Sequence, residues 1–128
     1  MIAGASGADL YARWCDYIDD EQTEDAFSYI VGLAASLQKY KCYPREKGEV
    51  LDFRFEDEAN EIPFAFIVNK RSLLFYFRKP AIRSGRYSTD RIEVDFDLLE
   101  RDNSAGEWRI RLCSIADVKR LWRILDLS

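Results

Sequence analysis

The stretch from residue 62 to residue 79, IPFAFIVNKRSLLFYFRK, constrains the fold more than any other part of the chain. It holds two apolar runs in which every second residue is large and hydrophobic, the period of a β-strand, and polar residues 69–72 separate the two runs. A one-residue slip would turn one strand's aromatic rings to the opposite face. The pattern therefore predicts a hairpin with six residues on one face, pairing Val68 with Leu73, Phe66 with Phe75, and Phe64 with Phe77.

Three further segments alternate in the same way and predict more strands. Residues 50–56 place Phe53 and Phe55 on one face, and a turn through 57–61 would set these rings opposite Phe66 and Phe64. Residues 91–98 alternate apolar and acidic side chains, and residues 107–113 follow after a turn signal at 102–106. In sequential order these segments predict a five-stranded antiparallel meander.

Helices are expected at both ends of the chain. Ser6 and Asp9 have the spacing of a capping box and would begin a first helix. Asp20 or Thr23 would cap a second helix that runs to about Tyr40, before Pro44. A third helix would begin at residue 114. The predicted fold class is α+β, with two N-terminal helices, a five-stranded antiparallel meander sheet and a C-terminal helix packed on one sheet face, in a single domain over residues 1–128.

Composition bounds the class of protein. A chain of 128 residues with 48% hydrophobic content can bury a continuous core. It has no apolar run near the roughly 20 residues that span a bilayer, and residues 1–10 lack the pattern of a secretory signal. Cys15, Cys42 and Cys113 match neither a disulfide framework nor a metal clip. We therefore expect a cytoplasmic protein with reduced thiols.

Catalytic chemistry has little support in the sequence. Histidine, the commonest general base and metal ligand, is absent. Glu93, Asp95 and Asp97 could bind a metal on one strand face, but the meander would instead set Asp97 opposite Arg109 and Asp95 opposite Arg111. We predict no catalytic residues, metal or cofactor. An enzyme or ligand carrier with an aromatic-lined pocket stays an alternative.

Charge is unevenly distributed along the chain. Residues 1–69 hold 6 basic and 14 acidic side chains, whereas residues 70–128 hold 13 and 9. A mobile basic loop with a tyrosine could contact nucleic acid, although overall acidity opposes non-specific binding of polyanions. A loop that merely keeps the sheet edge soluble is the other interpretation. The candidate nucleic-acid residues are Arg78, Lys79, Arg83, Arg86, Tyr87 and Arg91.

The second face of the predicted sheet supplies the leading functional hypothesis. Ala65, Ile67, Leu74 and Tyr76 point away from the aromatic face and adjoin one another at the sheet centre. A face in contact with water should be more polar than this. We therefore predict that these four residues form a protein-interaction or homo-oligomerising surface, unless the first helix covers them.

Overall fold

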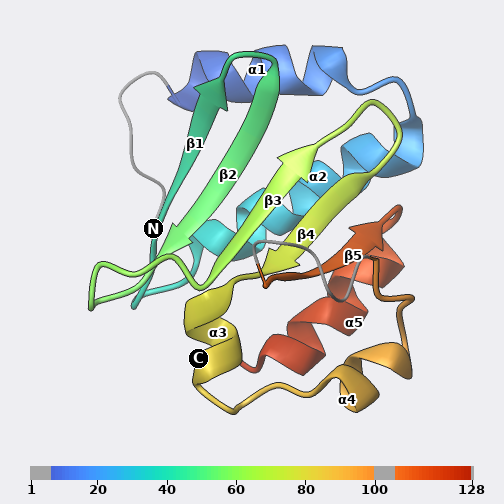
Figure 1. Cartoon of the computed structure of the whole chain (residues 1–128). Coiled ribbons are helices and arrows are strands. Elements are labelled where there is room, and N and C mark those ends of the chain that lie inside the picture. The colour runs from blue at the N-terminus through green and yellow to red at the C-terminus, as the bar shows by residue number, and fades with distance from the viewer. Residues whose placement is uncertain (1–6, 100–105, 128) are drawn as a thin grey trace.

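A computed structural model describes residues 7–99 and 106–127 (Figure 1). Its strands form one antiparallel sheet in the order β1-β2-β3-β4-β5. This confirms the α+β class, with two helices before the sheet and one after it. The elements in chain order are α1 (Gly7–Tyr17), α2 (Glu21–Ala35), β1 (Lys41–Lys47), β2 (Val50–Glu56), β3 (Phe64–Val68), β4 (Leu73–Phe77), α3 (Lys79–Arg83), α4 (Thr89–Glu93), β5 (Trp108–Leu112) and α5 (Ile115–Leu125).

The central hairpin has the predicted register, with all three pairs of residues opposite one another. Strand β2 also pairs as expected, so that Phe53 lies opposite Phe66 and Phe55 opposite Phe64. The rings of Phe53 and Phe66 stack with centroids 4.8 Å apart. Burying each such ring contributes about 1.5–3 kcal/mol to folding. The aromatic face of the sheet is therefore the core.

Helices α2 and α5 cover this aromatic face, behind the sheet in Figure 1. Phe27 and Ile30 of α2 and Leu121 of α5 are among the buried core residues. Helix α2 is capped by Asp20, whose carboxylate accepts hydrogen bonds from the Thr23 amide (2.9 Å) and hydroxyl (2.7 Å). These bonds lower the pKa of the Asp20 carboxyl. The helix was predicted to run to about Tyr40, but it ends at Ala35.

The C-terminal helix has the predicted start. The Ser114 hydroxyl accepts a hydrogen bond from the Asp117 amide (3.2 Å), and the Asp117 carboxylate accepts one from the Cys113 amide (2.8 Å). Both bonds satisfy amides at the start of α5 that have no partner within the helix. Ser6, the predicted cap of the first helix, lies outside the described residues.

The strand predicted at residues 91–98 is wrong, because this segment begins within a short helix. Ser88 caps α4 by accepting a hydrogen bond from the Arg91 amide (3.2 Å). Ile92 and Phe96, four residues apart, are buried, while Val94 is 75% exposed. A pattern with apolar residues at every second position also contains apolar pairs four residues apart. The same sequence therefore suits a helical turn when a capping residue precedes it.

The fifth strand is instead β1, which was not predicted. Its outer position leaves it largely polar, and Cys42 alone among its described side chains is buried. Pro44 is tolerated because β1 is an edge strand. The predicted pairing of Asp95 and Asp97 with Arg111 and Arg109 is also wrong, since β5 pairs with β4.

No helix within residues 7–99 and 106–127 is long and apolar enough to cross a membrane.

Candidate functional site

The face of the sheet opposite the core carries two rows of side chains that run across all five strands. We call these ten residues the open sheet face. The strand pairing places Ala65 beside Tyr76 in the middle of one row, and Ile67 beside Leu74 in the middle of the other. The first row is Tyr43, Arg54, Ala65, Tyr76 and Arg109; the second is Arg45, Asp52, Ile67, Leu74 and Arg111.

The described helices leave this face uncovered, and it is turned toward the viewer in Figure 1. Helix α1 packs on the core side, where Trp14 is buried and its Nε1 donates a hydrogen bond to Glu46 (3.1 Å). The first helix therefore does not cover the four apolar residues. Ala65 is buried between its neighbours, whereas Ile67, Leu74 and Tyr76 are half-buried.

One carboxylate joins two arginines at the β1–β2 side of the face. Oδ2 of the buried Asp52 lies 3.1 Å from Nη2 of Arg45 and 2.9 Å from Nε of Arg54. The Arg45 Nε is buried and has no hydrogen-bond partner among the described residues. Within this cluster, two guanidinium groups share one carboxylate.

Two more arginines lie at the β5 side. The Arg109 guanidinium stands over the Tyr76 ring, 5.7 Å from its centroid. The exposed Arg111 donates a hydrogen bond to the hydroxyl of Ser72 (2.8 Å), a neutral partner. The backbone amide of Leu99 donates to the carbonyl of Arg109 (2.8 Å), which brings Leu99 to the outer edge of β5.

Two shallow depressions mark this face, with volumes of about 210 and 370 Å³. The first lies over β1–β4, and the second lies between Leu74, Leu98 and Leu99. Their linings together contain five arginines against two carboxylates. The face thus combines an apolar centre with a basic rim in a chain whose net charge is −4.

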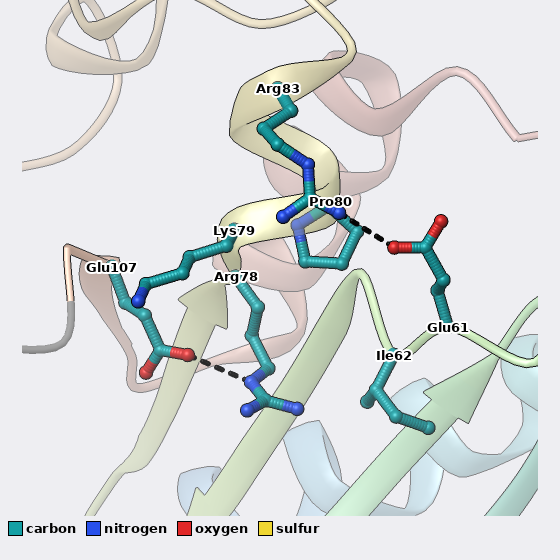
Figure 2. Close-up of a pocket in the computed structure, with 7 residues that line it drawn as sticks. All are labelled: Glu61, Ile62, Arg78, Lys79, Pro80, Arg83 and Glu107. Atoms are coloured by element: carbon teal, nitrogen blue, oxygen red, sulfur yellow. Dashed lines mark hydrogen bonds and ion pairs between the residues drawn. The ribbon is translucent and has the colours of Figure 1, made fainter.

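A third depression, of about 370 Å³, adjoins the open sheet face and shares Arg78 and Glu107 with the lining of the first depression (Figure 2). Here Arg83 pairs with Glu61 at 2.7 Å and Arg78 pairs with Glu107 at 2.8 Å. Lys79 also lines it. Three of the six candidate nucleic-acid residues therefore come together, two of them in ion pairs.

The other three candidates lie apart from that depression. Arg86 donates a hydrogen bond to the Asp126 carbonyl (3.2 Å), and Arg91 pairs with Asp95 at 3.0 Å. Tyr87 donates to the Leu125 carbonyl (2.7 Å), and its ring packs edge-on against two core phenylalanines. Burial raises the pKa of Tyr87 to about 12. The Tyr87 ring is thus part of the hydrophobic packing rather than a surface platform.

The three cysteines lack the environment of a reactive thiol. Burial raises the pKa of the Cys15, Cys42 and Cys113 thiols, which disfavours the reactive thiolate. Within residues 7–99 and 106–127, no three His, Cys, Asp or Glu side chains gather in a way that could hold a metal ion.

The apolar centre of the face is evident from the alternation of β3 and β4, but its basic rim was not predicted. Alternation alone turns Arg54, Arg109 and Arg111 away from the core. The incorrect strand at 91–98 gave the last two arginines acidic partners on a neighbouring strand. With β5 directly beside β4, they flank Tyr76 and Leu74 instead.

Comparison of the chain with protein-family models, with curated proteins and with solved structures finds no match in any of the three.

Proposed function

We propose that this chain is a protein-binding module that uses the open sheet face to hold a partner with an apolar centre and an acidic rim. The observation that carries the proposal is the position of Ile67, Leu74 and Tyr76, half-buried side chains between two arginine-bearing strands. Contact with apolar atoms would remove these side chains from water, and carboxylates would meet the arginines.

A second copy of the chain fits this face poorly. In a two-fold dimer each surface meets the same surface of its partner. Both flanks of the apolar centre bear arginines, so either orientation of the second copy would bring guanidinium groups together. The self-associating form of the interaction hypothesis is therefore the less favoured one, and we expect a monomer.

Nucleic acid is also a weaker fit to the centre of the face. Single-stranded nucleic acid is usually held by bases stacked on several aromatic rings. The centre is mainly aliphatic, and the Arg109 guanidinium already stands over the ring of Tyr76. Nucleic-acid binding through Arg78 to Arg91 stays a prediction, which anisotropy with labelled oligonucleotides at low and physiological salt would check.

The proposal is tested by selecting binders from a library of displayed random 20-residue peptides and measuring their affinity for variant proteins. We expect clones rich in apolar and acidic residues, whose affinity falls at least tenfold for Ile67→Asp/Leu74→Asp. Val94→Asp is the matched control, because Val94 is apolar and exposed but lies outside the face.

Clones that bind the double variant as tightly as the native chain would overturn the proposal, as would a library that yields no clones. Light scattering on the same proteins separates self-association. A native dimer that Ile67→Asp converts to a monomer would mean that the face binds its own copy.

A further inference from the structure

The shape of the open sheet face indicates which structural element of a partner it would hold. The apolar residues lie on β3 and β4, and the flanking arginines lie on β2 and β5. Neighbouring strands are about 4.8 Å apart, so the flanking strands are about 14 Å apart. An α-helix with its side chains is about 10–12 Å wide. One helix along β3 and β4 therefore fills the space between the arginines.

The spacing along the strands agrees with a helix. Ala65 and Ile67 are two residues apart on one strand, as are Leu74 and Tyr76 on the next, so the two apolar rows are separated by about 7 Å. Side chains three or four positions apart on a helix are about 5–6 Å apart. Two successive apolar turns of a helix would thus meet the two rows.

An added strand is disfavoured at both edges of the sheet. Pro44, in the middle of the edge strand β1, has no N–H to offer a further strand. At the other edge, Leu99 already donates to the Arg109 carbonyl of β5. Binding of a partner to the open sheet face is therefore favoured over strand addition at either edge.

We infer that the partner segment is an amphipathic α-helix that lies along β3 and β4, with apolar residues at i and i+3 or i+4 and with carboxylates on both flanks of that stripe. This inference rests on the proposed function. The charge on each flank selects acidic residues: Arg54 and Arg45 share the single carboxylate of Asp52 on one side, and Arg111 bonds a neutral hydroxyl on the other.

The length of the strands limits the contact. Strands β3 and β4 have five residues each and extend about 17 Å. A helix rises 1.5 Å per residue, so about 11 residues, or three turns, span the sheet. We expect the required part of a binding sequence to be of this size, and shortening it below two turns should abolish binding.

The test uses the clones from the peptide library that need Ile67 and Leu74. Their sequences should show apolar residues three or four apart, and circular dichroism should show helix gained on binding. A proline placed at the middle of the peptide, on its solvent side, should weaken binding at least tenfold, whereas alanine at the same position should not.

A charge exchange tests the orientation. Arg111→Glu should weaken binding of an acidic peptide at least fivefold, and changing one flanking glutamate of the peptide to arginine should restore affinity to the variant. Arg123→Glu, which changes an exposed arginine of α5, is the matched control and should have no effect.

The inference would be overturned if the clones that depend on the face had apolar residues at every second position, tolerated the proline or gained no helix on binding. The proposed function would still stand in each of these cases. An absence of face-dependent clones would instead remove the proposed function itself. The two failures are thus distinguishable in one selection.

Discussion

Asp52 shows how a single buried carboxylate organises part of a surface. It is nearly inaccessible to water, yet both of its contacts are to arginines of the open sheet face. Its Oδ2 accepts from Arg45 on β1 and from Arg54 on its own strand. The guanidinium groups are thereby held at one flank of the apolar centre.

Replacing Asp52 with asparagine should destabilise the fold by about 1–2 kcal/mol, because the acceptor of two hydrogen bonds from arginine loses its negative charge while the partly exposed arginines regain contact with water. Urea denaturation followed by circular dichroism measures the change. Glu58→Gln, at an exposed position in the turn after β2, is the matched control and should shift stability by less than about 0.5 kcal/mol. Equal effects of the two substitutions would contradict this account of Asp52.

Strand β3 separates two roles on its two faces. Phe66 is completely buried in the core, whereas its neighbour Ile67 is half-buried on the open sheet face. Alternate side chains of β3 therefore lie in the core and in the candidate site. Substitutions can change one of these two surfaces without changing the other.

Phe66→Ala should cost about 3–5 kcal/mol of folding free energy, because it leaves a cavity among packed rings. Ile67→Ala should cost about 1 kcal/mol, because that side chain is only half removed from water. Chemical denaturation of both variants makes the comparison. If Ile67→Ala proved as costly as Phe66→Ala, the face would be part of the core and unavailable to a partner.

Sequence patterns could predict β2, β3, β4 and β5 because each has a buried face made of alternating large residues. They could not predict β1, since an edge strand with one buried side chain lacks that alternation. The segment around Ile92 and Phe96 was ambiguous because its spacing suits both a strand and a helical turn, and the Ser88 cap decides for the helix. The prediction omitted β1 and included an incorrect strand at 91–98, so the number of strands was correct. The strands beside Arg109 and Arg111 were predicted incorrectly.

At the scale of the whole molecule, burial moves the titration of Tyr11, Cys42 and Tyr87 to high pH. Burial raises the pKa of Tyr11 and Tyr87 to about 12 and that of Cys42 to about 11. Each pKa lies above the group's ordinary value, so the folded chain retains these protons to higher pH than the unfolded chain does. The contribution of these protonated groups to the free energy of unfolding is complete below about pH 9 and is lost as the pH rises toward 12.

The free energy of unfolding should therefore fall between pH 9 and pH 12. Tyr87→Phe should cost about 1 kcal/mol at neutral pH, through the lost hydrogen bond to Leu125, and should flatten the decline above pH 10. Urea titrations at a series of pH values measure both effects. A variant whose stability declined as steeply as that of the native chain would show that the phenol does not contribute.

Charge differs between helices α1 and α2 on the core side and the open sheet face. Residues 7–35, which include these two helices, contain seven acidic side chains and one basic one, whereas the linings of the two depressions on the open sheet face contain five arginines and two carboxylates. The field of such a molecule rotates an anionic partner toward the sheet before the two surfaces touch. Added salt would then slow association by shortening the reach of that field, which is only about 8 Å at physiological ionic strength. The lifetime of the complex would depend mainly on the apolar contacts and would change less.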